Sequence, residues 1–321
     1  MGQCSSAGRK AINQDFHGAG TPDNYLLDAK GIALAIADGI SSSNVSQIAS
    51  KTAVTGFIAD YYCTPDVWSV KHSAQKVLQA TNAWLFSQTQ NSPYRFNKDK
   101  GYVCTFSSII FKSNTFHVFH SGDSRVYRLA NNNFEQLTQD HRRVVSEDTS
   151  YLTRALGIQP QLELDYRAEP LSINDVFILT TDGIYEYVDN STMMTLVSEH
   201  EHDLDSACQA ILDLALNNGS EDNLTIQIVK ILDLPEHQIE EVQQQISSLP
   251  LPPMLAARME FDGYQILRNI YISSRSHVYL AKDMDTQQQV ILKTPSTEFR
   301  TDKQYLESFL MEDWIAKRID N

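Results

Sequence analysis

The stretch Val176-Phe177-Ile178-Leu179-Thr180-Thr181-Asp182-Gly183 joins an apolar run to an Asp-Gly pair. A run of this length, rich in β-branched and aromatic residues, is typical of a buried strand. The Asp-Gly pair is typical of a tight turn at the end of that strand. In the same way, residues 32–37 lead into Asp38-Gly39, and residues 115–120 are closely followed by Gly122-Asp123. Three aspartates are therefore expected at strand ends, each beside a glycine.

Two more acidic positions could join these three. Asp222 directly precedes the apolar segment 224–231, and Asp15 lies near the amino end in Asn13-Gln14-Asp15. One Asp-Gly pair alone is usually only a turn, but strand ends that converge would bring their carboxylates together. Two carboxylates about 4 Å apart repel each other by about 4 kcal/mol at an effective dielectric constant of about 20. Such a cluster requires cations or raised pKa values, and ligation by oxygen alone suits Mg²⁺ or Mn²⁺.

The pattern of helices and strands predicts the fold class. Helices are predicted at residues 43–62, 69–90, 193–197 and 203–216. Further strands are predicted at residues 102–111, 125–129 and 224–231. Hairpins interleaved with paired helices predict an α+β fold, a β-sandwich flanked by helix pairs. They do not match the regular β-α-β alternation of a doubly wound parallel sheet.

The composition narrows the classes of protein. Of the 321 residues, 42% are hydrophobic and 21% are charged, which is ordinary for a globular protein. The formal net charge of -14 disfavours nucleic acid and anionic membranes as partners. No apolar run approaches the roughly 18 residues that a membrane span needs. Four cysteines without paired spacing predict neither a zinc site nor a disulfide framework, and they favour a reduced, cytoplasmic setting.

Two other patterns have plain interpretations. The start Met1-Gly2-Gln3-Cys4-Ser5-Ser6 formally fits an N-myristoylation pattern, but short lipidation patterns match often by chance. A first β-strand leading into Ser5-Ser6-Ala7-Gly8 is the favoured interpretation. His117, His120 and His141 are interpreted as structural or surface histidines, because the ligand spacing HxxxH does not recur.

Six motifs that contain these aspartates and their neighbours occur in order. They are Asn13-Gln14-Asp15, Ala37-Asp38-Gly39, Ser121-Gly122-Asp123-Ser124-Arg125, Leu152-Thr153-Arg154-Ala155-Leu156-Gly157, Thr180-Thr181-Asp182-Gly183-Ile184 and Glu221-Asp222-Asn223-Leu224-Thr225. Together they resemble the type 2C metal-dependent protein phosphatases, over about residues 2–232. The resemblance implies the α-β-β-α sandwich of that family and the hydrolysis of phosphoserine and phosphothreonine in proteins. It also implies phosphorylated proteins as partners.

The resemblance implies a role for most of the aspartates. Asp38 would bridge two Mn²⁺ or Mg²⁺ ions, with the carbonyl of Gly39 on one of them, and Asp182 and Asp222 would complete the pair. Two ions about 3.5–4 Å apart can share a water molecule and lower its pKa from about 15.7 toward neutrality. This water would attack phosphorus directly, so no phosphoenzyme is expected.

Other positions around the ion pair follow from the same resemblance. Asp15 would hold metal-bound waters and act with the catalytic aspartates, and Asp123 would help to bind a third ion. Asn223 and Gln14 would support these ligands from behind. Residues 142–157 correspond to the mobile flap beside the active site.

The chain departs from the family pattern at three places. The phosphate-binding arginine of the family corresponds to Lys10, which is a point charge without the bidentate fork. The family's Glu corresponds to Gln14, which removes one negative charge. Ile40-Ser41-Ser42 stands where eukaryotic members carry a histidine that is proposed as the general acid. These departures motivate an alternative, a pseudophosphatase or the regulatory module of a fused phosphatase–kinase signalling protein.

The last part of the chain resembles a different family. Residues 263–321 are similar to the first strands of a eukaryotic-like protein kinase, with Lys293 in place of the kinase lysine and Glu312 in place of its glutamate partner. Residues 272–275 lack the glycines of a nucleotide loop. The sequence ends at Asn321, before a catalytic loop, so no kinase activity is expected from this chain. A small β-rich appendage with a chance VxxK strand is the alternative.

The domain organisation follows from these resemblances and from a shift in composition after Leu234. Residues 1–233 are predicted to form the phosphatase domain. Residues 234–262 contain a polar, Gln-rich part and the Pro-rich run 249–253, and they are predicted to be a semi-rigid linker. Residues 263–321 are predicted to form a partial kinase N-terminal lobe, with a kinase as a further candidate partner.

Overall fold

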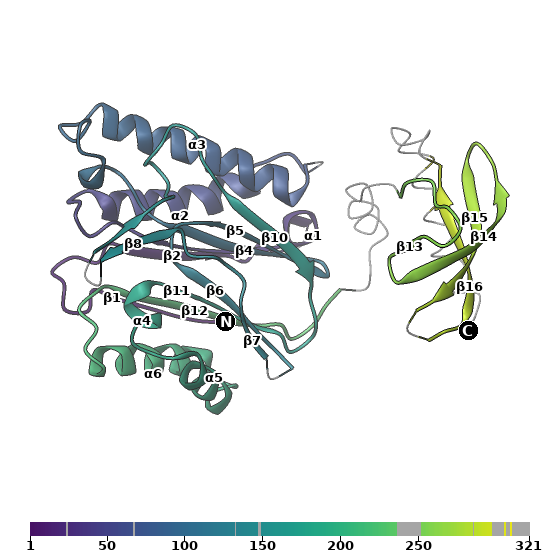
Figure 1. Ribbon diagram of the computed structural model, residues 1–321. Helices are drawn as coiled ribbons and strands as arrows, with labels where there is room; N and C mark the ends of the chain where they lie inside the picture. The colour runs from purple at the N-terminus through teal and green to yellow at the C-terminus, as the bar shows by residue number, and fades with distance from the viewer. Residues whose placement is uncertain are drawn as a thin grey trace. The chain divides into compact units, whose positions relative to one another are not determined.

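The structure is a computed structural model that describes residues 1–23, 25–66, 68–131, 133–146, 149–235, 252–284 and 286–296, together with Tyr305 and Phe309. Contacts divide the chain into two units, Met1–Glu236 and His237–Asn321. Each unit is described by itself (Figure 1). Within the described residues, no helix is both long enough and apolar enough to cross a membrane.

Two antiparallel five-stranded sheets form the centre of the first unit. In the first sheet the strand order is β1 (Gly2–Ser6), β12 (Leu224–Lys230), β11 (Val176–Thr180), β6 (Arg125–Ala130) and β7 (Asn133–Gln136). In the second sheet it is β10 (Asp165–Pro170), β5 (Thr115–Ser121), β4 (Phe106–Lys112), β3 (Ile32–Asp38) and β2 (Asp15–Gly20). Strands from the two ends of this unit are therefore neighbours, since β1 pairs with β12.

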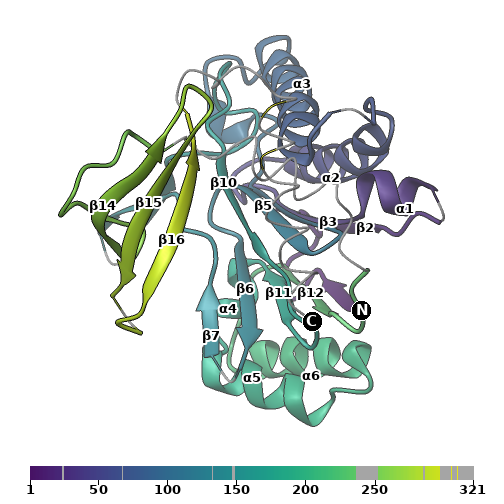
Figure 2. The ribbon, with the colours of Figure 1, turned by 90° about the vertical axis from the view of Figure 1, so that its right-hand side faces the viewer.

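Helices cover the outer face of each sheet (Figures 1 and 2). The second sheet is covered by α2 (Ser46–Tyr62) and α3 (Val70–Gln90), with the short α1 (Tyr25–Lys30) beside them. The first sheet is covered by α4 (Asp182–Tyr185), α5 (Asn190–Glu199) and α6 (Leu204–Asn217). This arrangement of helix, sheet, sheet and helix confirms the predicted α+β sandwich.

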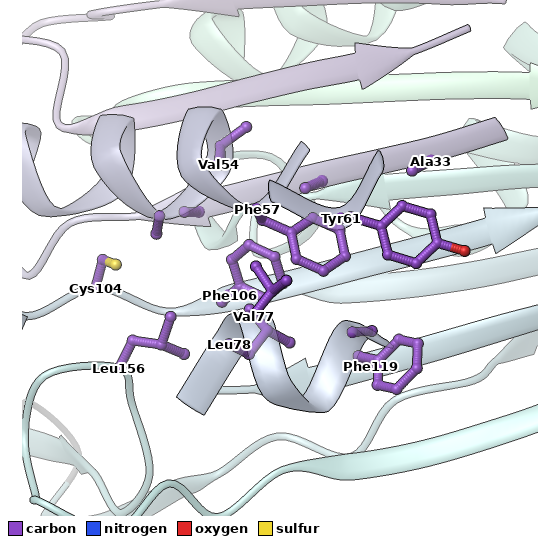
Figure 3. Packing of buried hydrophobic residues seen from close by; sticks show 14 of the residues in the cluster. Ala33, Val54, Phe57, Tyr61, Val77, Leu78, Cys104, Phe106, Phe119 and Leu156 are labelled. Carbon is purple, nitrogen blue, oxygen red and sulfur yellow. The ribbon is translucent and has the colours of Figure 1, made fainter. Parts of the chain in front are cut away.

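Three buried apolar layers hold the unit together. One lies between α2, α3 and the second sheet, where the rings of Phe57 and Phe106 meet edge to face at 5.1 Å (Figure 3). Another lies between the two sheets, where Phe177 contacts Phe111 and Phe116, each with ring centres 5.0 Å apart. The last lies beneath the helices of the first sheet. Aromatic pairs of this kind contribute about 0.5–1.5 kcal/mol each beyond the area they bury.

The amino terminus forms the predicted first strand. A Cβ added at Gly2 would lie 2.1 Å from the carbonyl carbon of Leu204, so only glycine fits where β1 passes the start of α6. Gly2 is buried at this position. The strand interpretation of the first residues is therefore correct.

One strand begins clearly later than predicted. Residues 102–111 were expected to be one strand, but β4 begins at Phe106. Cys104 instead makes single bridges to Gly39 on one side and to Leu156 on the other. The segment before β4 is irregular because it links two neighbouring loops rather than two strands.

Several elements were not expected from the sequence. They are α1, α4, β2, β7, β10, the short helix η1 (Lys98–Lys100) and the hairpin of β8 (Arg142–Ser146) and β9 (Thr149–Leu152). The helix α4 begins at Asp182 itself, so this aspartate starts a helix directly after the strand β11. Most of these elements are short, and their residues show no clear apolar period.

The second unit contains an antiparallel sheet in the order β13 (Glu260–Phe261), β14 (Tyr264–Ile272), β15 (Ser276–Asp283) and β16 (Gln289–Pro295). Its small core consists of Leu255, Ile266, Tyr279 and Ala281. Lys293 lies on β16, whereas Glu312 lies outside the described residues. Most of the predicted linker, including Pro250, also lies outside them.

Candidate active site

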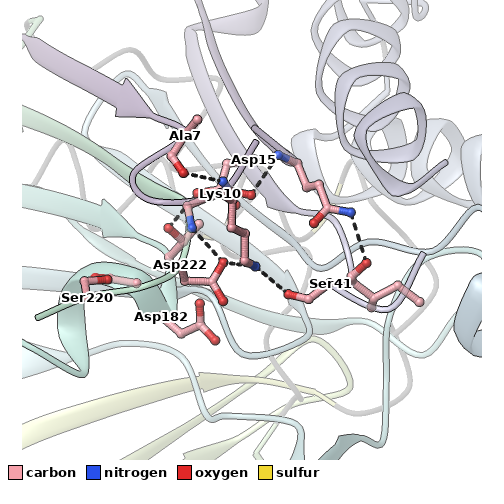
Figure 4. Close-up of polar contacts among 12 residues, drawn as sticks. Ala7, Lys10, Asp15, Ser41, Asp182, Ser220 and Asp222 are labelled. Atoms are coloured by element: carbon pink, nitrogen blue, oxygen red, sulfur yellow. Dashed lines mark hydrogen bonds and ion pairs between the residues drawn. The ribbon is translucent and has the colours of Figure 1, made fainter. Parts of the chain in front are cut away.

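Five aspartates from distant parts of the chain meet at one end of the sandwich. Asp15 begins β2 and Asp38 ends β3, and the two are direct register partners. Asp182 follows β11 as the first residue of α4, and Asp222 lies just before β12. Asp123 lies in the turn between β5 and β6. Figure 4 shows Asp15, Asp182 and Asp222 close to one another. The structure therefore brings together the carboxylates that the sequence singled out.

The electrostatics of the site show that these carboxylates act on one another. Burial, followed by the charges of Asp15, Asp182, Asp123 and Asp222, raises the pKa of Asp38 well above its usual value. Burial also raises the pKa of Asp15 to about 6, although hydrogen bonds from two threonines oppose the shift. The pKa of Asp182 is raised to about 8, first by burial and then by the charges of its acidic neighbours. Cations that bind here would relieve this repulsion.

The Asp38-Gly39 turn is held rigidly. The backbone N–H of Asp38 donates to the Thr105 hydroxyl at 2.9 Å, and the N–H of Thr105 donates to the Asp38 carbonyl at 2.7 Å. A Cβ added at Gly39 would lie 2.8 Å from backbone atoms of Ser46, so a glycine is required there. Thr105 also bonds the Ser124 hydroxyl at 2.7 Å, which couples this turn to the one that carries Asp123.

Two threonines position Asp15. The hydroxyls of Thr181 and Thr225 donate to its Oδ2 atom at 2.9 and 2.8 Å. Both residues belong to the motifs quoted above, but their role was missed. A hydroxyl directly before Asp182, and another just after the Asp222-Asn223 pair, was the signal that could have indicated it. They link β2 to the ends of β11 and β12, which fixes one carboxylate relative to the others.

Asn223 and Gln14 hold the amino-terminal loop. The Asn223 side chain accepts from the backbone N–H of Gln14 at 2.8 Å and donates to the carbonyls of Ala7 and Ile12 at 3.0 Å each. The Gln14 amide nitrogen donates to the Ser43 carbonyl at 2.7 Å. A carboxylate could not make this last bond because it carries no donor. The amide of Gln14 therefore holds the segment that leads into α2.

Lys10 lies within the site. Its Nζ atom donates to the Ser41 hydroxyl at 2.7 Å and forms an ion pair with Asp222 (Figure 4). The loop before β2 thus places a positive charge directly against the acidic cluster.

Arg142, which belongs to the segment that resembles the flap and has no role implied by that resemblance, reaches the same cluster. Its Nε atom lies 3.3 Å from Asp123 Oδ2, its Nη2 atom 3.3 Å from Asp182 Oδ2, and its Nη1 atom 2.5 Å from Glu186 Oε1. A cavity of about 380 Å³ opens beside it, with Asp38, Ser41, Tyr151 and Asp182 among its lining residues.

The possible metal ligands of the site are the carboxylate oxygens of the aspartates, with no sulfur among them. Such oxygen ligands are the ones that hard divalent cations prefer. In the described part of the chain, however, no three His, Cys, Asp or Glu side chains already form a group that could hold a metal ion. Lys10 forms an ion pair with Asp222, and Arg142 forms ion pairs with Asp123 and Asp182. Metal binding therefore competes with these two side chains.

The histidines have structural partners. His120 bonds the Ser107 hydroxyl at 2.8 Å and the Gln139 carbonyl at 3.0 Å. His141 accepts from the backbone N–H of Gly122 at 3.1 Å and lies 2.9 Å from Asp165. These bonds match the structural interpretation of both residues.

Comparison with known proteins gives consistent matches. The family model of protein phosphatase 2C matches residues 4–232. The serine/threonine phosphatase stp of Listeria welshimeri is 25% identical over 221 residues, which cover 61% of this chain and 82% of that protein. The protein phosphatase PhpP of Streptococcus pneumoniae is 22% identical over 240 residues, which cover 70% of this chain and 93% of that protein.

Solved structures share the fold. The Mycobacterium tuberculosis serine/threonine phosphatase PstP/Ppp matches with a TM-score of 0.61 at 22% identity, over 72% of this chain and 97% of that one. The catalytic domain of PstP in complex with two manganese ions matches with a TM-score of 0.60 at 23% identity, over the same shares of the two chains.

Proposed function

The chain belongs to the protein phosphatase 2C family, and from this membership we propose that it hydrolyses phosphoserine and phosphothreonine in proteins with the help of Mn²⁺ or Mg²⁺. The observation that carries the proposal is the meeting of Asp15, Asp38, Asp123, Asp182 and Asp222 beside one cavity. The names of the relatives, stp and PhpP, support the same activity. The two manganese ions of the PstP catalytic domain support the cofactor.

In this proposal the aspartates divide the work of holding the ions. Asp38, the carbonyl of Gly39, Asp182 and Asp222 would hold a pair of ions, and Asp123 would contribute to a third. Asp15 would hold water beside the pair, since Thr181 and Thr225 fix its carboxylate. Bound divalent ions lower the pKa of water and neutralise the charge that builds up on phosphoryl oxygens.

The side chains of the chain itself would bind and orient the substrate. Lys10 would attract the phosphoryl group, because its ammonium lies at the acidic cluster and is held by Ser41. The aspartates of the cluster are assigned to binding the ions, and a water molecule is expected to attack the phosphorus. No protein nucleophile is therefore needed, and no phosphoenzyme should form. The cavity of about 380 Å³ would receive the phosphorylated side chain.

The test is phosphate release from a phosphothreonine peptide in the presence of Mn²⁺. Asp182→Asn should lower kcat by at least about a thousandfold, because it removes a charge from the centre of the cluster. Calorimetric titration should show fewer bound Mn²⁺ ions in this variant, and circular dichroism should show the same fold. Wild-type rates in Asp182→Asn would reject the proposal.

A pseudophosphatase is the second candidate, motivated by Lys10 and Gln14. The Gln14 amide donates a hydrogen bond to the Ser43 carbonyl just before α2, so a structural role explains why an amide stands at this position. This explanation weakens the case for a degenerate site. Titration of the wild type with Mn²⁺ separates the two candidates. A chain that binds no Mn²⁺ and releases no phosphate would favour the pseudophosphatase.

For the whole chain we propose the division into a phosphatase domain (1–233), a linker (234–262) and a partial kinase N-terminal lobe (263–321). The antiparallel order of β14, β15 and β16 supports the last part, as does the position of Lys293 on β16 opposite Val278. A cytoplasmic signalling protein that opposes or regulates a kinase would fit this division. An open reading frame that continues past Asn321 into a kinase catalytic loop would support the fusion.

A further inference from the structure

The hairpin of β8 and β9, here called the flap hairpin, carries Arg142 at the candidate active site. Hydrogen bonds hold both ends of this hairpin in place. The preceding residue, His141, exchanges backbone and ring hydrogen bonds with Gly122, at 2.7 and 3.1 Å. The N–H of Thr153, just after β9, donates to the His141 carbonyl at 2.8 Å. Both ends of the hairpin are therefore tied to the turn that carries Asp123, and Arg142 is the first residue beyond that tie.

The guanidinium of Arg142 is shared among three carboxylates. Its three nitrogen atoms reach one oxygen each of Asp123, Asp182 and Glu186. Arg125 is different, because its Nε and Nη2 atoms close a fork on both oxygens of Asp140 at 2.7 to 3.2 Å. A guanidinium is best matched by a group that offers two oxygens in one plane. The fork of Arg142 has no such partner among its three carboxylates.

The position of Arg142 faces the space that a substrate would enter. Arg142 lines the cavity of about 380 Å³ together with Asp38, Ser41 and Tyr151. A phosphoryl group carries a charge of about -1.5 to -2 at neutral pH, and the carboxylates of this cavity would repel it. Lys10 offers only a point charge and is already paired with Asp222. A second cation with a planar fork would offset the repulsion between the carboxylates and the phosphoryl group.

We infer that Arg142 is the residue that grips the phosphoryl group of the substrate in this chain. The inference rests on the proposed phosphatase function. Two phosphoryl oxygens accept from the guanidinium fork, taking over N–H groups that now reach Asp123 and Asp182. Arg142 thereby supplies the bidentate contact that Lys10 lacks, and it does so from the flap instead of from the amino-terminal loop.

The experiment compares Arg142→Ala, Arg142→Lys and Arg143→Ala. Arg143 is the matched control, because it is exposed and adjacent strand residues point to opposite faces. For each protein, kcat and KM are measured on a phosphothreonine peptide with saturating Mn²⁺, together with inhibition by inorganic phosphate. Mn²⁺ affinity is measured by calorimetry and folding by thermal melting.

The expected result is a parallel loss of substrate and phosphate binding. Arg142→Ala should raise KM and the inhibition constant of phosphate by about tenfold to a hundredfold, which corresponds to a charged hydrogen-bonding contact. Arg142→Lys should lie between this variant and the wild type, because it keeps the charge and loses the fork. Arg143→Ala should leave both constants within about twofold of the wild type.

Other outcomes overturn the inference. If Arg142→Ala tightens Mn²⁺ binding while the inhibition constant of phosphate stays unchanged, Arg142 serves only as a counter-ion of the aspartates. If Arg142→Lys equals the wild type, the fork is not used. Should Arg142→Ala fail to fold, the lysine variant decides alone. A wild type that binds Mn²⁺ and hydrolyses nothing would refute the proposed function, which is a separate result from an unchanged phosphate constant.

Discussion

At the scale of single residues, each aspartate of the site depends on neighbours that are distant in the sequence. Asp15 is held by Thr181 and Thr225, more than a hundred and fifty positions away along the chain. Asp38 is held by Thr105. The sequence identified Asp38, Asp123 and Asp182 because each lies beside a glycine at a strand end, and it identified Asp15 and Asp222 through the motifs quoted above. It did not identify the threonines, because a hydroxyl near a strand end is common and its partner is visible only in three dimensions.

A buried histidine gives a prediction about pH at this scale. His117 bonds the Tyr166 hydroxyl at 2.9 Å, and burial, with a smaller contribution from the charge of Lys112, lowers its pKa to about 4. An unfolded histidine has a pKa of about 6.5, so the unfolded chain binds more protons between these values. The stability that this residue contributes is therefore complete above about pH 6.5 and is lost as the pH falls toward 4, by about 2–3 kcal/mol.

The variant His117→Gln should remove this part of the pH dependence. Urea unfolding at pH 7 and pH 4.5, with EDTA present, measures the free energy of unfolding in both proteins. The control is His202→Gln, since the His202 side chain is 93% exposed. Comparison between variants is needed because burial also raises the pKa of Asp15 to about 6, within the same range. Equal pH slopes in wild type and His117→Gln would contradict the prediction.

At the scale of elements, the site lies at the ends of strands, next to turns and a short helix. The strand β11 runs directly into the four-residue helix α4, and Gly183 is the second residue of that helix. A Cβ added at Gly183 would lie 2.0 Å from the carbonyl oxygen of Asn223. This close approach sets the separation between Asp182 and Asp222. The residue at the joint must therefore lack a side chain.

Substitution at this joint should be destabilising. Gly183→Ala should lower the free energy of unfolding by at least about 2 kcal/mol, because the blocking atom belongs to the backbone and cannot turn away. The matched control is Gly56→Ala in the middle of α2, where no atom lies within 4 Å of the added Cβ. This control should be more stable than the wild type by about 0.5–1 kcal/mol. Chemical denaturation of the wild type and the two variants measures both changes in the free energy of unfolding. If Gly183→Ala unfolds with the same free energy as the wild type, the close approach of Gly183 to Asn223 does not require a glycine.

At the scale of the whole molecule, the chain divides into two units, each with its own buried core. All five aspartates of the site belong to the first unit. β1 and β12, which come from its two ends, pair along the whole length of β1. The first unit therefore closes on itself through these two strands, and among the described residues its two large sheets consist of its own strands.

This closure predicts that residues 1–235 are sufficient for activity. A fragment ending at Pro235 should keep kcat and KM for a phosphothreonine peptide within about twofold of the full chain, because every residue assigned to the site is retained. Limited proteolysis of the full chain should cut first near Pro250, in the segment that the sequence predicts to be a linker. If the folded fragment is inactive, the second unit contributes to the site.

The sequence by itself determined the class of fold, the position of the long helices and most strands, and the five aspartates. These features follow from local signals, namely the apolar period of each segment, the turn residues at its end and the short motifs that contain the aspartates. The tertiary structure alone decided how the strands are ordered, that Thr181 and Thr225 hold Asp15, and that Arg142 reaches the acidic cluster. The physical reason is that sheet pairing joins residues at any separation along the chain, whereas a sequence pattern reports only on neighbours within a few positions.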